Sequence, residues 1–149
     1  MRGELNKQQV ENLLLSQVVG RIACCSKGRP YIVPVTYVYD GEYIYGQMQE
    51  GKKLELLRKN KHICFETDIM TDMANWKSVV ITGMFEELSD EKAEKARELL
   101  SNSIFYLMTH AMVHGHEHEV TAEVNDENRI KPVLYRIKIE EKSGRFERR

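Results

Sequence analysis

The sequence predicts a mainly β protein, an antiparallel β-barrel that carries peripheral helices. Short segments rich in β-branched and aromatic residues predominate, and turn signals join several of them. Strands and helices do not alternate in the rhythm that builds a parallel sheet. With 149 residues the chain can bury a core without disulfides, so we expect one domain over residues 1–149.

The first third of the chain predicts one helix and then three strands. Asn6 and Gln9 have the spacing of a capping box at the start of the helix NKQQVENLLLSQ, whose leucines form a buried stripe. The strand GRIACCS follows and ends at the turn KGRP. The strand Tyr31 to Tyr39 then runs into Asp40-Gly41, a strong hairpin signal, and the chain returns as EYIYGQ.

The remainder predicts two helices and three strands. A leucine-spaced helix is expected from Lys52 to about Asn60, followed by the strand HICFET. DIMTDMAN has no periodicity and predicts a loop, whereas Trp76 to Leu88 predicts a long strand with apolar residues on both faces. Ser89 precedes the amphipathic helix DEKAEKARELL, and VLYRIKIEE closes the chain as an alternating strand. Residues 101–131 have no clear pattern.

Charge and composition exclude several classes of function. The 22 basic and 23 acidic residues are spread along the chain and give a net charge of −1, so we expect no nucleic-acid partner. The N-terminal MRGELNKQQ is too polar for a signal peptide, and no apolar run approaches a membrane span. The odd set Cys24, Cys25 and Cys64 suggests reduced, buried thiols, and we expect a cytoplasmic protein without a membrane partner.

Two lysines at a helix start are the first candidate site. The N-terminus of a helix carries unpaired N–H groups and a partial positive charge, so Lys52 and Lys53 are unfavourable there by about 0.3–1 kcal/mol each. A bound phosphate would reverse that penalty, and Gly51 would let the backbone approach it. Alternatively, the lysines are solvated surface residues whose repulsion is partly offset by Glu50 and Glu55.

Pro34 is the second signal. Proline inside a strand removes a ladder hydrogen bond, so it marks a plain edge strand, a bulge or a point of ligand approach. A groove from Pro34 to Lys53 would be long enough for a nucleotide-like ligand with a flat ring at one end.

The ordered motifs resemble a known family. GRPYIVPVTYVYDGEYIYGQMQEGKKLELLRKNKHICFETD, followed by WKSVVITGMFEEL, is similar to the flavin-binding split barrels related to pyridoxamine 5'-phosphate oxidase, nearest the nitroimidazole-resistance branch. The shared order is G-x-P-x-x-x-P-V-x-Y, a hairpin, a strand, G-[KR]-K-x-x-x-L and N-x-x-x-C-F. The resemblance covers about Leu5 to Leu88 and recurs in the closing strand and SGRFE. It implies an antiparallel split β-barrel that forms a homodimer, with one FMN in each of two clefts at the subunit interface.

By position, the resemblance also implies four sets of cofactor contacts. The phosphate site would be Gly51, Lys52 and Lys53. The wall beside the isoalloxazine, largely backbone, would be Val33, Pro34, Val35 and Thr36. The border of the ribityl chain and ring would be Tyr45, Gly46 and Gln47. The contribution of the partner subunit would be Trp76, Lys77 and Ser78, although a large aromatic such as Trp76 also suits plain packing.

Two positions depart from family members of known activity. Nitroimidazole reductases have a histidine where this chain has Gln47, and the oxidases have a phosphate-binding arginine where it has Val33. The basic and aromatic C-terminal set of the oxidases has no evident counterpart. We therefore expect neither specific reduction of nitro drugs nor oxidation of pyridoxamine phosphate.

The resulting hypothesis is an FMN-dependent oxidoreductase that passes electrons to a small-molecule acceptor. Flavin carries the chemistry, so no protein catalytic residue is predicted. The alternatives are a flavin-binding or redox-sensing protein without turnover, and the same scaffold holding a deazaflavin or haem.

The histidines of THAMVHGHEH form a separate cluster. His110, His114, His116 and His118, with Glu117, could ligate a transition metal, but no cysteine or second ligand pair completes a standard site. We therefore predict no metal and expect this segment to form a flap over the flavin.

Overall fold

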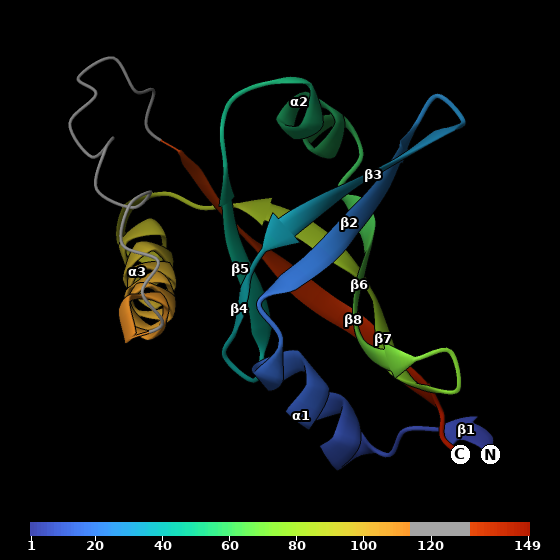
Figure 1. Ribbon diagram of the computed structural model, residues 1–149. Helices are drawn as coiled ribbons and strands as arrows, with labels where there is room; N and C mark the ends of the chain where they lie inside the picture. Colours follow the sequence, from blue (N-terminus) through green and yellow to red (C-terminus); the bar gives the residue numbers. More distant parts are fainter. Residues whose placement is uncertain (114–131) are drawn as a thin grey trace.

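A computed structural model describes residues 1–113 and 132–149, with side chains up to residue 103 and from residue 132 onward (Figure 1). The elements in chain order are β1 (Arg2–Glu4), α1 (Lys7–Ser16), β2 (Val19–Ser26), β3 (Arg29–Thr36), β4 (Val38–Tyr39), β5 (Tyr43–Met48), α2 (Lys52–Lys59), β6 (His62–Asp72), β7 (Asn75–Glu87), α3 (Asp90–Val113) and β8 (Val133–Glu147).

The strands form one antiparallel sheet that curls into a barrel, which confirms the predicted fold class. The strand order is β3–β2–β6–β7–β8–β5–β4, and β1 pairs with the end of β8. The two ends of this order, β3 and the β4–β5 hairpin, are not paired with each other in the described residues. The split between them leaves room for a groove beside β3 and β5.

Local sequence signals set the hairpins and the first helix. Lys27 and Gly28 both have positive φ, 52° and 75°, as a two-residue turn between twisted antiparallel strands requires. The capping box of α1 is present, because the Gln9 backbone N–H donates to the Asn6 side chain and the Asn6 N–H donates to the Gln9 side chain. These predictions are confirmed.

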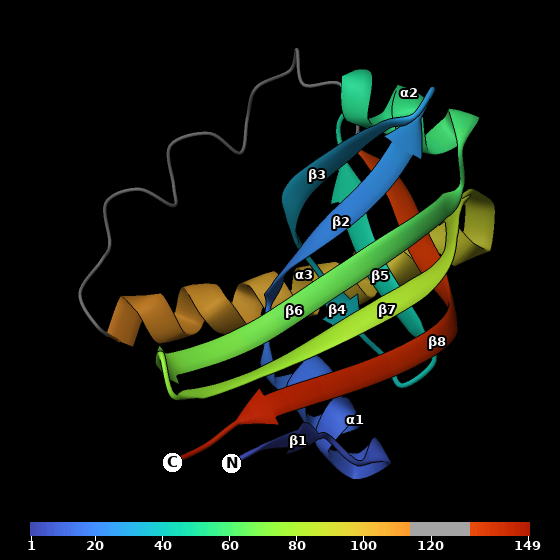
Figure 2. The same ribbon diagram turned by 90° about the vertical axis from the view of Figure 1, so that its right-hand side faces the viewer.

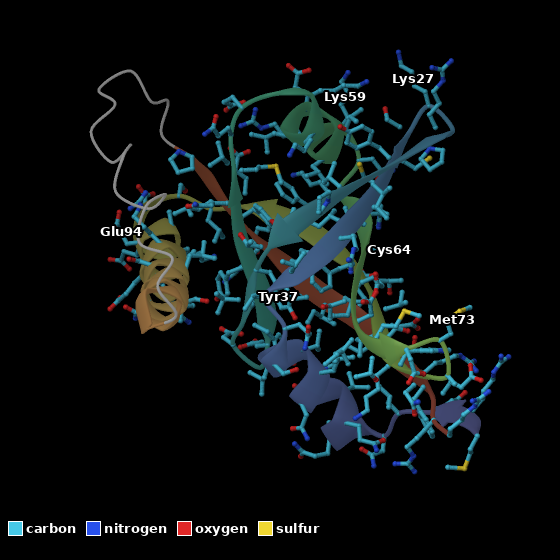
Figure 3. The ribbon with its side chains drawn as sticks, in the orientation of Figure 1. Lys27, Tyr37, Lys59, Cys64, Met73 and Glu94 are labelled. Atoms are coloured by element: carbon cyan, nitrogen blue, oxygen red, sulfur yellow. The ribbon has the colours of Figure 1, made fainter. Side chains whose placement is uncertain are left out.

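The barrel interior is closed by a helix at each end (Figure 1). Leucines of α1 close one end, and Leu54 and Leu57 of α2 are buried at the other. Tyr37 points into the interior between them (Figure 3), where its ring meets Phe65 edge to face at 4.9 Å. The Tyr37 hydroxyl donates to the Leu14 carbonyl at 2.8 Å, which joins the strands to α1.

The two outside surfaces of the sheet differ. α3 packs on the β5–β8 side, where Ala96 and Leu100 meet Tyr45 and Leu134. No described helix covers the opposite side, which faces the viewer in Figure 2. We call that side the outer sheet face. The side chains of this face include Ile32, Pro34, Val19, Arg21, Ala23, Cys25, Cys64, Glu66, Asp68, Met70, Ser78, Val80 and Thr82 on β3, β2, β6 and β7.

Three expectations about element lengths were wrong. Residues 68–72 are strand rather than loop, because Asp68, Ile69 and Met70 pair with Ser78, Lys77 and Trp76 across the hairpin. That ladder forms through pairing and needs no alternation in the sequence. α3 continues to Val113 and β8 to Glu147, both well beyond the expected ends.

The cysteine prediction was correct for one residue of three. Cys24 is buried, but Cys25 and Cys64 are exposed. Figure 3 shows Cys64 on the outside of β6. In the described part of the chain, no helix combines the length and apolar character needed to cross a membrane.

Candidate functional site

A groove of about 490 Å³ lies where β3, β5 and the start of α2 meet. It brings together the two predicted signals, the proline of the edge strand and the lysines of the helix. The predicted cofactor residues that line it are Pro34, Val35, Thr36, Gln47, Gly51, Lys52 and Lys53.

The helix start in this groove has free backbone donors. α2 begins at Lys52 after Gly51, and no side chain caps it. The first N–H groups of the helix therefore remain available to an anion. A Cβ placed on Gly51 would meet no atom within 4 Å, so the space in front of the backbone is open.

The positive charge at the helix start is not compensated by the glutamate before it. Arg58 holds Glu50 through two hydrogen bonds of 2.9 Å and also binds Glu87 at 2.7 Å. Lys52 instead lies over the Tyr31 ring, 5.7 Å from its centroid. Within the described residues, neither Lys52 nor Lys53 has an ion-pair partner, so the groove presents two lysines and a helix dipole of the same sign.

The groove walls combine apolar surface with polar rims. Pro34 lies on the edge strand β3, opposite Arg21. Tyr31 and Val35 pack against the barrel core, and Met48 lies almost fully buried across the groove. The exposed Gln47 stands beside Met48 on β5. Such a surface suits a flat, mostly apolar ring with polar edges.

Three predicted residues on these strands have other positions. Val33 is half buried opposite Ile22, and Tyr45 is only 1% exposed beneath α3. Gly46 is covered by Tyr135, whose Oη would lie 2.2 Å from a Cβ at that position. None of the three residues lines the groove.

The remaining predicted residues lie away from the groove. Trp76 and Lys77 line a second pocket of about 290 Å³ beside the β6–β7 hairpin, and the Trp76 indole donates to Glu147 at 3.2 Å. Figure 1 shows this hairpin and α2 at opposite ends of the molecule. Ser78 lies on the outer sheet face opposite Asp68. Within one chain, therefore, these residues do not meet the groove.

Sequence reasoning missed some residues of the groove: Tyr31, Met48, Gln49 and Glu50. Tyr31 could have been found, because it alternates with Val33 and Val35 on one face of β3. The other three directly precede Gly51, so continuity along the chain was the available signal.

A separate polar cluster consists of Glu11, Tyr39 and Lys142. The Tyr39 hydroxyl donates to Glu11 at 2.5 Å, and Lys142 contacts both groups, which joins α1 to β8. Burial raises the pKa of Tyr39. These contacts attach the helix to the barrel.

The histidine cluster lies outside the described side chains, so its predicted role as a flap is not tested. Among the described residues, no group of three His, Cys, Asp or Glu side chains could hold a metal ion.

Comparisons with known proteins agree with this geometry. The family model described as pyridoxamine 5'-phosphate oxidase matches residues 6–146. A FAD-binding protein from Mesorhizobium loti superposes with a TM-score of 0.73 at 30% identity, over 98% of this chain and 96% of that one. A proposed 5-nitroimidazole antibiotic resistance protein from Bacteroides thetaiotaomicron gives 0.67 at 16% identity, over 98% and 87%.

A sequence relative matches part of the chain. An uncharacterized protein from Rhizobium meliloti is 31% identical over 84 residues, which are 56% of this chain and 56% of the relative. The aligned part thus spans about half the length of that relative. The family model covers nearly the whole chain, and the chain therefore belongs to the pyridoxamine 5'-phosphate oxidase family.

Proposed function

We propose that this protein binds FMN in the β3–β5–α2 groove and works as a flavin-dependent oxidoreductase. The observation that carries the proposal is the uncapped positive end of α2, which opens onto a groove with an apolar wall. Glu55 lies in the first turn of this helix, but among the described residues it forms no ion pair with Lys52 or Lys53. A FAD-binding relative at 30% identity over almost the whole chain supports a flavin as the ligand.

The residues present fit the phosphate end of a flavin. Lys52, Lys53 and the free N–H groups of α2 bind the phosphate, and the open space at Gly51 admits it. Pro34 and Val35 lie against the ring, and Gln47 offers an amide to its polar edge. When bound, the flavin accepts a hydride from a reduced nicotinamide and passes electrons to an acceptor such as a quinone, a nitro compound or oxygen.

A second copy of the chain completes the proposed site. Trp76, Lys77 and Ser78 are not among the residues that line the groove within one chain. In a homodimer, these residues of the partner would cover the flavin and exclude water from it.

Measured affinities for FMN, riboflavin and FAD test which flavin the groove binds. FMN carries a terminal phosphate, riboflavin carries none, and FAD extends beyond the phosphate with an adenosine. We expect FMN to bind at least about tenfold more tightly than riboflavin, because charge-assisted hydrogen bonds hold the phosphate. Tighter binding of FAD than of FMN would change the cofactor but keep the flavin assignment.

The variant Lys53→Ala tests the phosphate site directly. It should weaken FMN binding about five- to tenfold and leave riboflavin binding unchanged, as measured by flavin fluorescence quenching. Lys59→Ala is the matched control, because Lys59 is an exposed lysine at the opposite end of the same helix (Figure 3). A colourless protein that takes up no flavin would remove the proposal.

Turnover is tested separately, by steady-state oxidation of NADH and NADPH by the flavin-loaded protein. Oxidation above the rate of free flavin supports an oxidoreductase. Tight flavin binding without turnover would instead support a carrier or redox sensor on the same scaffold.

A further inference from the structure

The pocket of about 290 Å³ beside the β6–β7 hairpin is separate from the β3–β5–α2 groove. One wall is a row of side chains on three neighbouring strands, because Ile69 of β6 stands opposite Lys77 of β7, and Lys77 stands opposite Phe146 of β8. Leu5 and Gln9, at the entry to α1, also line it. The pocket and the groove share no lining residue among those that the structure describes, and they lie at opposite ends of the molecule (Figure 1).

The apolar part of this pocket is held in place by β1. A Cβ on Gly3 would lie 3.0 Å from two carbons of the Phe146 ring, so the ring lies close against the β1 backbone. The Met1 ammonium donates to the Arg148 carbonyl at 2.7 Å, and the Arg148 N–H donates to the Met1 carbonyl at 2.8 Å. These contacts fix Phe146 and the buried Leu5 as walls that exist before any ligand binds.

Two cations of the pocket have no acidic partner. Lys77 stands between the apolar Ile69 and Phe146 in its row. The next residue on the same side of β7 is the fully buried Val79. The Arg148 guanidinium lies 5.8 Å from the centroid of the Phe146 ring. Within the described part of the chain neither Lys77 nor Arg148 forms an ion pair, so the pocket combines apolar walls with positive charge that is free to bind an anion.

Acids on the neighbouring strands are already engaged. Glu147 accepts from the Trp76 indole at 3.2 Å and pairs with Arg2 Nε at 3.1 Å. Asp72 accepts from the Asn75 side-chain amide at 3.0 Å through both of its oxygens. The charge of the two cations therefore remains available to a ligand.

We propose that this pocket binds a small planar aromatic carboxylate. The ring lies against Phe146, Ile69 and Leu5. The carboxylate lies between Lys77 and Arg148, whose guanidinium has the planar fork that matches a carboxylate. Because about 290 Å³ is at the lower end of the range for small-molecule sites, roughly 300–1,000 Å³, the pocket fits one ring or two fused rings.

This site goes beyond the proposed flavin function and does not depend on it. Side chains alternate along a strand, so Lys77 lies on the opposite side of β7 from Ser78, whose side chain is on the outer sheet face. Binding in the pocket needs one chain alone, and it can be measured without flavin.

The fluorescence of Trp76 measures occupancy, because Trp76 lines the pocket and is the only tryptophan of the chain. Flavin-free protein is titrated at neutral pH with para-nitrobenzoate, whose nitroaromatic ring quenches indole emission on contact. We expect saturable quenching with a Kd of about 1 mM or lower. The neutral analogue para-nitrobenzyl alcohol should bind at least about tenfold more weakly, because it lacks the charge-assisted hydrogen bonds. Quenching without saturation, or equal affinity for both compounds, would overturn the inference.

The variant Lys77→Met tests the contact with the anion. It keeps the apolar stem of the side chain and should weaken para-nitrobenzoate binding at least about tenfold, with para-nitrobenzyl alcohol unchanged. Lys59→Met is the matched control, because Lys59 is an exposed lysine on α2 (Figure 3). Loss of saturable quenching in Lys53→Ala but not in Lys77→Met would place the anion at α2 and refute the inference.

Ile69→Glu gives a second, independent test of the location. Ile69 is 45% exposed, so the change should leave the circular dichroism spectrum as it is in the wild type. The new carboxylate stands opposite Lys77 and should pair with it, which removes the saturable quenching by para-nitrobenzoate. A folded Ile69→Glu protein that binds para-nitrobenzoate with the wild-type affinity would exclude this pocket as the site.

Discussion

The arginine–carboxylate clusters of Arg136 and Arg21 lie on opposite outside surfaces of the barrel, and they differ in how well they are paired. Beside α3, Arg136 Nε donates to Glu86 Oε2 at 2.7 Å and Nη2 to Oε1 at 3.3 Å, and the guanidinium lies 4.0 Å from the centroid of the Tyr43 ring. On the outer sheet face, the shortest contact of Arg21 to an acid is 3.4 Å. The cluster with the shorter hydrogen bonds, that of Arg136 and Glu86, therefore lies on the surface on which α3 packs.

The two glutamates respond in opposite directions. Hydrogen bonds from Arg136 hold the pKa of Glu86 below its ordinary value. Burial and Asp68 raise the pKa of Glu66 to about 7. Arginine and glutamate therefore form a fully hydrogen-bonded pair beside α3, whereas on the outer sheet face the same residue types leave one glutamate oxygen without a partner.

Removal of each arginine should give the largest contrast. Arg136→Met should lower the free energy of unfolding by about 2 kcal/mol, because it removes the packing of a largely buried guanidinium on Tyr43 as well as its bidentate pair with Glu86. Arg21→Met should cost about 1 kcal/mol or less near pH 6, because its contacts are long and partly exposed. Urea denaturation of both variants measures the difference, and equal losses would contradict the comparison.

The charge of Glu66 should have the next largest effect. Since its folded-state pKa is raised above the unfolded value, the native state loses stability as the pH rises through about 7. Glu66→Gln should therefore raise the free energy of unfolding by about 1–2 kcal/mol near pH 8, after allowance for partial exposure, and change nothing at pH ~3.5, below the unfolded pKa of 4.5. Urea titrations at fixed protein concentration, with Glu42→Gln as control, test this, and a gain of equal size at both pH values would refute the charge explanation.

Glu86 should show the opposite pH dependence with a smaller effect. Its folded-state pKa is lowered, so its contribution is present above the unfolded value near 4.5 and is lost as the pH falls below it. Because Glu86 is 40% exposed, we expect only about 1 kcal/mol. Thermal unfolding of wild type and Glu86→Gln should differ near pH 7 and converge near pH 3, and a constant difference would argue against the ion pair.

Features with a local cause could be predicted from the sequence. The capping box of Asn6, the hairpins and the helix start at Lys52 depend on neighbours a few residues away, and the structure has all of them. The groove was predictable for the same reason, because the chain passes from β5 to α2 along its wall.

Features that depend on strand pairing were not predictable. Residues 68–72 become strand only through β7, and Arg21 meets Glu66 across 45 residues of sequence because β2 lies beside β6. No local sequence pattern predicts that β2 pairs with β6. Trp76 is a related case, since only the fold shows that it lies far from the groove within its own chain.

A second buried polar atom of the barrel, the Tyr135 hydroxyl oxygen, also lacks a hydrogen-bond partner. The Tyr135 hydroxyl is buried in the core over Gly46 and has no hydrogen-bond partner. The Tyr135 Oη is the atom nearest Gly46, and the centroids of the Tyr135 and Phe85 rings lie 5.2 Å apart, so neither contact is a hydrogen bond of the hydroxyl. Tyr135→Phe should thus raise the free energy of unfolding by about 0.5 kcal/mol and leave FMN affinity unchanged. Weaker FMN binding by a stable Tyr135→Phe protein would show instead that this hydroxyl contributes to the flavin site.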